Sequence, residues 1–170
     1  MNTLTIRAFV LAVAAVSTCD AAWGNNPVTQ NFDEQTSKHF IGSSKRSYAL
    51  RKSKKLNKPI IVLLTKKGCG ACQNLKQSVN MDSAKLGLDT LLSNFVVVHA
   101  EGAEMEQWQG QGEGYAPQTY FFAPGEEQPL PVLGTSKTSP HFFHDADTLK
   151  WGMETAIKAV ETGARSNTEL

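Results

Sequence analysis

The chain has 170 residues, of which 41% are hydrophobic and 19% charged, and its formal net charge is +1 at pH 7. This composition is typical of a globular protein of one domain, which is long enough to form a core without disulfide or metal staples. The nearly balanced charge gives no reason to expect nucleic acid or an anionic membrane as a partner.

The first 22 residues have the layout of a secretory signal peptide. One arginine precedes an uninterrupted apolar run over residues 8–16, and small residues follow. The run is shorter than the roughly 20 residues that span a bilayer, but a charged start, a short apolar middle and a small-x-small cleavage site are typical of secretion signals. We expect cleavage after Ala21 or Ala22, which would leave no membrane segment.

Removal of this signal would also remove Cys19 and leave two of the three cysteines, Cys69 and Cys72. A secreted chain enters a compartment in which thiols can be oxidised. The expected location is the endoplasmic reticulum (ER) lumen or the cell exterior, with the bacterial periplasm as the alternative. In each of these compartments the pair would be available for redox chemistry.

The segment before the first predicted strand divides into two parts. Residues 23–42 are polar and irregular, and we expect an extended lead-in. Residues 43–58 are strongly basic with few helix breakers, which predicts a surface helix with a thin apolar stripe of Tyr48, Leu50 and Leu56. The charges of this helix are best interpreted as a solvated face.

The middle of the chain predicts a strand–helix–strand unit. The apolar run "PIIVLLT" is typical of a strand buried on both faces. A helix should begin at the cysteines, because Leu75 and Val79 lie four positions apart on one face. Residues 83–94 predict a second helical piece and residues 95–100 another buried strand. The two strands should be parallel and joined by a right-handed crossover.

The rest of the chain predicts a loop, a hairpin and a helix. Residues 101–114 are acidic and glycine-rich, as in a loop, and "QTYFFA" and "PLPVLG" should pair as an antiparallel hairpin. A last helix is predicted over residues 147–162. Its apolar face consists of Leu149, Met153, Ile157 and Val160. This order of elements resembles the α/β thioredoxin-like fold, with a central mixed β-sheet flanked by helices, in a domain over residues 43–163.

Cys69 and Cys72 have the spacing that thiol–disulfide exchange needs. The attacking species is the thiolate, and an unperturbed thiol has a pKa of about 8.5, so it is mostly protonated at neutral pH. Free N–H groups at a helix N-terminus favour an anion, so we expect Cys69 to attack. Cys72, one turn further on the same face, should be more buried and should resolve the mixed disulfide.

A zinc site and a purely structural disulfide are weaker interpretations of the pair. Zinc needs four ligands, and besides the cysteines the chain offers four histidines, of which His141 and His144 lie three positions apart. A structural disulfide would close a very short loop and therefore gain little entropy. We expect no metal and no other cofactor.

Pro117 stands just before the third predicted strand. In thioredoxin-like proteins a cis proline at this point lies against the cysteine pair and offers backbone groups to a client peptide, whereas a trans proline that merely starts an edge strand is the alternative. By this resemblance the supporting and client-binding residues are Gly70, Ala71, Ala116 and Pro117. Many thioredoxins also bury a carboxylate behind the cysteines. Glu101 is the nearest candidate here, and we expect it to be exposed, which leaves the proton acceptor open.

Several segments together resemble the small ER-resident thioredoxin-domain family, of the thioredoxin domain-containing protein twelve and anterior gradient type. They are "KSKKLNKPIIVLLTKKGCGACQNLK", "NFVVVHAEG", "GYAPQTYFFAPGE" and the closing "TEL". The Cys-Gly-Ala-Cys pair is similar to the oxidoreductase branch of that family. The resemblance implies a thiol–disulfide oxidoreductase that acts on secretory-pathway client proteins through Cys69 and Cys72. A client-binding chaperone, or a secreted thioredoxin-like protein with little redox turnover, is the alternative.

Three positions depart from this family pattern. Gly68 stands where the family usually has tryptophan, and Gln118 where it tends to have arginine. Within the expected tail of residues 164–170, the terminal residues Asn167–Leu170 end like an ER-retrieval signal but lack its lysine–aspartate form. The resemblance therefore implies a retrieval receptor as a second partner, with secretion as the alternative.

Overall fold

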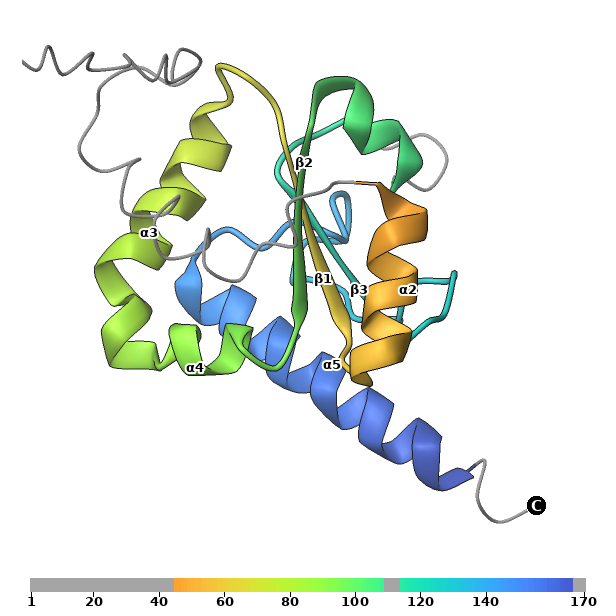
Figure 1. Cartoon of the computed structure of the whole chain (residues 1–170). Coiled ribbons are helices and arrows are strands. Elements are labelled where there is room, and N and C mark those ends of the chain that lie inside the picture. The colour runs from red at the N-terminus through yellow and green to blue at the C-terminus, as the bar shows by residue number, and fades with distance from the viewer. Residues whose placement is uncertain (1–44, 109–113, 167–170) are drawn as a thin grey trace, which may run out of the picture.

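The computed structural model describes residues 45–108 and 114–166 (Figure 1). The expected signal peptide, the lead-in, part of the glycine-rich loop and the terminal Asn167–Leu170 lie outside these described residues. Within the two described ranges, no helix combines the length and hydropathy that a bilayer crossing requires.

Three strands form the central sheet in the order β2-β1-β3. They are β1 (Ile60–Thr65), β2 (Val96–Glu101) and β3 (Gln118–Phe122). β1 pairs parallel with β2 and antiparallel with β3. Every residue of β1 is buried, as expected for a central strand that is covered on both faces. The predicted mixed sheet and its parallel strand–helix–strand unit are confirmed.

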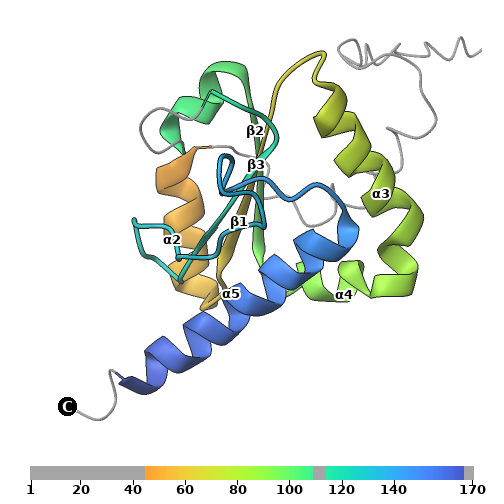
Figure 2. The same cartoon turned by 180° about the vertical axis from the view of Figure 1, so that it is seen from behind.

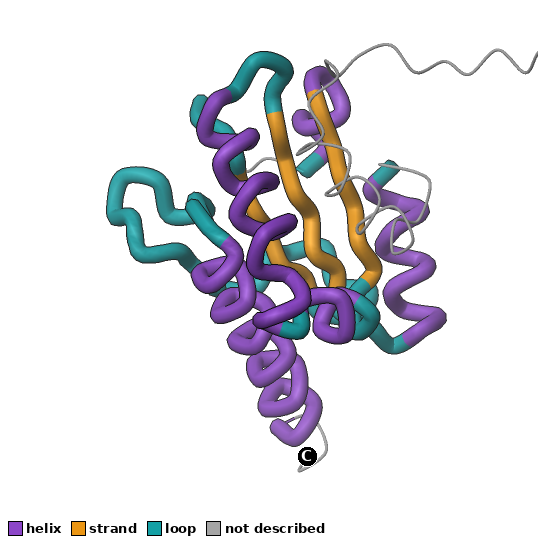
Figure 3. The backbone as a smooth tube through the Cα atoms, turned by 90° about the vertical axis from the view of Figure 1, so that its left-hand side faces the viewer, coloured by secondary structure: helices purple, strands orange, loops and turns teal. Residues whose placement is uncertain are grey.

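Helices cover both faces of this sheet, as the views in Figures 1, 2 and 3 show. The helices are α2 (Arg46–Leu56), α3 (Gly70–Leu86), α4 (Leu88–Leu92), the 3-10 helix η1 (Gly102–Gln107) and α5 (Ala146–Ser166). Because successive side chains of a strand point to opposite faces of the sheet, the residues of β1 pack in two hydrophobic cores, one on each face. Leu63 packs with α3, α4 and α5, whereas Leu64 packs with α2 and η1.

The second strand of the predicted hairpin does not form, and that prediction was wrong. Residues 129–134 contribute only an isolated antiparallel bridge, between Pro129 and Phe122. Pro129 and Pro131 have no N–H to donate to a ladder, so the pairing stops after one bridge. β3 therefore remains the last strand of the sheet among the described residues.

The basic helix α2 buries a different face from the predicted one. Tyr48 and Leu56 of the expected apolar stripe are 39% and 47% exposed, whereas Ala49 and Ser53 are fully buried. The Ser53 hydroxyl is satisfied because it accepts a hydrogen bond from the N–H of Gly125 at 3.3 Å. Small side chains allow the helix to pack closely on the sheet. Tyr48 and Leu56 are left exposed, whereas Leu50 of the predicted stripe is partly buried against the core.

Two helix boundaries also differ from the prediction. The segment over residues 83–94 is divided at Gly87, whose φ of 66° ends α3 in the left-handed region before α4 begins. α5 starts at Ala146 and runs to Ser166, past the predicted end at residue 162 and into the residues expected as a tail. Its predicted core residues Leu149 and Met153 are buried.

Asp145 caps the N-terminus of α5. Its Oδ1 accepts hydrogen bonds from the Thr148 N–H at 2.8 Å and from the Thr148 hydroxyl at 2.7 Å. Burial by itself would raise the pKa of Asp145, but the hydrogen bonds from Thr148 and the neighbouring His144 outweigh it, so the pKa is lowered. The cap therefore favours the ionised carboxylate.

Replacing Asp145 with alanine should lower the free energy of unfolding by about 1 kcal/mol at neutral pH, the usual cost of losing a cap. Asp145→Asn keeps a neutral acceptor, so it isolates the charge. Because the folded-state pKa is depressed, the advantage of aspartate over asparagine should be present above the unfolded pKa and disappear as the pH falls through the folded one. Urea unfolding at neutral and acidic pH measures the difference in stability between the wild type and Asp145→Asn. If this difference is as large in acid as at neutral pH, this account is contradicted.

Candidate active site

The cysteine pair lies where the chain leaves β1 and enters α3. Cys69 is the N-cap residue of α3, and its Sγ accepts a hydrogen bond from the backbone N–H of Cys72 at 3.1 Å. The first N–H groups of a helix have no partner within the helix and carry partial positive charge. A thiolate at Cys69 would be stabilised there, and the predicted helix start at the cysteines is confirmed.

The two cysteines form a disulfide with a Cα–Cα distance of 5.3 Å. Cys72 is 1% exposed, whereas Cys69 is partly exposed. The predicted order of burial is therefore confirmed. Cys69 is thus accessible from solvent, and Cys72 lies behind it.

The loop before β3 lies beside this pair. The Ala116–Pro117 peptide bond is cis, as the position predicted, and the Ala116 carbonyl oxygen lies 3.5 Å from the Cys69 Sγ. The fold thus brings this loop to the cysteines although Ala116 and Cys69 are 47 positions apart in the sequence. Gly70 is exposed and Ala71 partly exposed in the first turn of α3, so both of these residues and the Ala116 carbonyl lie next to Cys69.

Gln118, which follows the cis proline, points into the protein. It is fully buried. Its side-chain amide donates to the Tyr115 carbonyl at 2.9 Å, and its Oε1 accepts from the Tyr120 hydroxyl at 3.0 Å. The Tyr115 hydroxyl in turn accepts from the backbone N–H of His141 at 2.8 Å. This network holds the loop in place, and nothing in the local pattern of residues pointed to it.

Lys76 is a further residue of the site that the sequence pattern did not single out. It follows Cys72 by one helical turn on the buried face of α3 and is 1% exposed. The spacing of four residues from Cys72, within the stripe that includes Leu75 and Val79, is the signal that could have found it.

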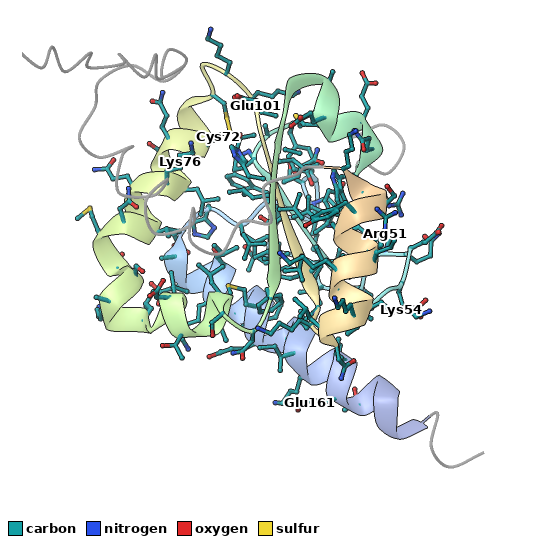
Figure 4. The ribbon with its side chains drawn as sticks, viewed as in Figure 1. Arg51, Lys54, Cys72, Lys76, Glu101 and Glu161 are labelled. Carbon is teal, nitrogen blue, oxygen red and sulfur yellow. A yellow bond between two sulfur atoms is a disulfide. The ribbon has the colours of Figure 1, made fainter. Side chains whose placement is uncertain are left out.

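Glu101 is not the exposed acid that the sequence predicted, because its side chain is only partly exposed. Its Oε1 is buried and has no hydrogen-bond partner among the described residues. Partial burial raises the pKa of Glu101, while the positive charges of Lys76 and Lys67 act in the opposite direction. Figure 4 shows Cys72, Lys76 and Glu101 gathered at the same end of α3 and β2.

The two histidines considered as metal ligands have other contacts. The His141 ring stacks on Tyr120 at a centroid distance of 4.0 Å, and His144 Nε2 lies 3.1 Å from an Asp145 carboxylate oxygen. In the part of the chain that the structure describes, no three histidine, cysteine or acidic side chains come together as metal ligands.

Comparison with known proteins agrees with the architecture. Residues 44–124 match a family model described as thioredoxin-like. That segment includes the cysteine pair, the cis proline and all three strands of the sheet. A search of curated proteins found no match. The chain thus contains a thioredoxin-like domain whose Cys69–Cys72 pair, at disulfide distance, is consistent with thiol–disulfide exchange.

Proposed function

We propose that the protein is a thiol–disulfide oxidoreductase that exchanges electrons with cysteines of client proteins. The observation that carries this proposal is the arrangement of the two sulfurs. Cys69 is partly exposed and sits at the N-terminus of α3, and the buried Cys72 lies one turn behind it at disulfide distance. This arrangement supplies one sulfur for the client and a second for release.

In the oxidising direction, a client thiolate attacks the Cys69 Sγ and breaks the Cys69–Cys72 bond, so Cys72 leaves as a thiolate. A second client thiolate then attacks the client sulfur of the mixed disulfide. The client disulfide forms, Cys69 leaves as a thiolate, and two electrons have passed from client to protein. The reducing direction runs these steps backwards, and the relative potentials of the partners decide the direction.

The surroundings of Cys69 support a client-binding role. The exposed Gly70 and the Ala116 carbonyl, 3.5 Å from the Cys69 Sγ, border the reactive sulfur. A client segment that presents its cysteine to Cys69 would pass over these backbone groups. Gly70, Ala71, Ala116 and Pro117 are accordingly proposed to position the client.

We further propose that the clients belong to the secretory pathway. The layout of residues 1–22 and the family resemblance of the cysteine segment support this placement, and residues Asn167–Leu170 are proposed to engage a retrieval receptor. Expression of the full chain with and without its last four residues tests the receptor. Loss of these residues should move the protein from cells to medium, and unchanged retention would contradict the receptor's role.

The test of the activity is catalysed turnover by the full chain. Insulin reduction by dithiothreitol, and oxidation of a dithiol peptide in glutathione buffer, are compared for the wild type and the variant Cys69→Ser/Cys72→Ser. We expect acceleration by the wild type and the uncatalysed rate with the variant. A wild type without turnover, together with equal suppression of client aggregation by both proteins, would instead favour a client-binding chaperone.

A further inference from the structure

Lys76 lies in the same buried stripe of α3 as the resolving cysteine. Cys72 and Lys76 are each 1% exposed, and lysine is almost never this buried in proteins unless it is paired. Residues four apart on a helix have Cβ atoms about 5–6 Å from each other. Because helical side chains lean toward the N-terminus, the Lys76 side chain extends toward Cys72.

Glu101 faces the same region from β2. It ends the strand, opposite Thr65 of β1, and strand alternation places it on the face of Val97, which packs in the core beneath α3 and α5. The positive charge of Lys76 acts to lower the pKa of Glu101. In the view of Figure 4, Glu101, Lys76 and Cys72 are labelled in one region, near the start of α3 and the end of β2. A buried cation and a partly buried anion therefore share the space behind the disulfide.

Among the described residues, other ionisable groups on the elements that border this space include Lys67, His99 and Cys69. Lys67 is exposed in the loop after β1, so solvent and salt screen its charge. His99 of β2 is engaged through its Nε2 with the Thr65 hydroxyl at 2.7 Å. A charge on Lys76 acts in the protein interior, where the effective dielectric constant is lower and electrostatic interactions are stronger.

We propose that Lys76 and Glu101 are positioning residues of opposite effect that together set how readily the Cys69–Cys72 disulfide is reduced. When a thiol attacks Cys69, Cys72 departs as a thiolate inside the protein. The ammonium of Lys76 stabilises this anion and hence the reduced protein, whereas the disulfide carries no charge to stabilise. The carboxylate of Glu101 repels the same anion and favours the disulfide. This role deepens the proposed function and rests on it.

The consequence is measurable as an equilibrium with glutathione. Two glutathione thiols reduce the protein disulfide and become glutathione disulfide, so two electrons pass to the protein. We expect Lys76→Met to lower the equilibrium constant for reduction about tenfold, which corresponds to about 30 mV in the potential of a two-electron couple. Glu101→Gln should raise the constant. Lys76→Arg keeps the charge and should stay close to the wild type.

The measurement uses the full chain, equilibrated in glutathione buffers, alkylated and analysed on the peptide that carries both cysteines. Lys85→Met and Glu104→Gln are matched controls, because both side chains are exposed on α3 and η1, and both should leave the constant unchanged. If Lys76→Met does not fold, Glu101→Gln decides by itself. Shifts of both site variants in one direction, or no shift in Glu101→Gln, would overturn the proposal.

A second readout separates an electrostatic role from a packing role. In a Cys69→Ser background, the pH dependence of Cys72 alkylation reports the ionisation of that thiol. Lys76→Met should move the profile to higher pH and Glu101→Gln to lower pH. Loss of packing would not produce opposite shifts. Both measurements are independent of client turnover, so a wild type that fails in the insulin assay refutes the oxidoreductase and leaves the charge effect to be judged by its own result.

Discussion

Replacing Cys72 with serine should turn the protein into a trap that holds clients in mixed disulfides through Cys69. Cys69 is the partly exposed sulfur, at the start of α3, so it can still be joined to a client. Release requires a second thiolate, and Cys72, only 1% exposed, is the one placed to attack. Without it the mixed disulfide persists until an external thiol arrives, so turnover should fall by orders of magnitude.

Cys69→Ser is the matched variant, because it retains the buried cysteine and loses the accessible one. We expect no client capture and no turnover from it. Both variants are incubated with a disulfide-bonded client, quenched by alkylation and separated without reductant. Equal capture by the two variants, or stronger capture by Cys69→Ser, would contradict the assignment of Cys69 as the attacking sulfur.

Replacing Gly152 with alanine should destabilise the protein by about 1–3 kcal/mol, as overpacking of a core does. A Cβ at this position would lie 2.6 Å from the Phe143 Cε1 and 3.1 Å from the Phe121 Cζ. Both rings are at most 1% exposed and meet edge to face at 5.7 Å, so neither has room to retreat. The clash should exceed the gain of about 1 kcal/mol that alanine has over glycine in a helix.

Gly163→Ala provides the control on the same helix. An added Cβ at Gly163 meets nothing within 4 Å, so helix propensity alone should act, and this variant should be as stable as the wild type or more so. Urea unfolding monitored by circular dichroism compares the two. A midpoint for Gly152→Ala at or above that of the wild type would show that the core around Phe143 adapts.

Features governed by neighbours in the chain were predicted well. The run from Ile60 to Thr65 is wholly apolar apart from its last residue, and it forms the central strand. The helix α3 begins directly after its N-cap residue Cys69, because a cap acts on backbone N–H groups within the first turn of the helix. The order of burial of the two cysteines was predictable for the same reason, since Cys72 falls on the apolar face of α3 and is 1% exposed.

Features that depend on distant segments were missed or misjudged. Tyr48 and Leu56 looked like the packing stripe of α2, but close approach to the sheet selected Ala49 and Ser53. Gln118 stands out in the sequence only as a departure from arginine, yet hydrogen bonds with Tyr115 and Tyr120 hold it inside the protein.

Local patterns of apolar and small residues were thus enough to assign the three strands that form the sheet and the helix that begins after Cys69, because these elements depend on interactions between residues close in the sequence. These local patterns did not reveal the charged side chains behind the disulfide. Lys76 and Glu101 belong to different elements, and only the packing of α3 on β2 places them in a common environment that is partly shielded from solvent. Burial, and the strength that it lends to a charge, belong to the assembled fold and to no segment of the chain taken alone.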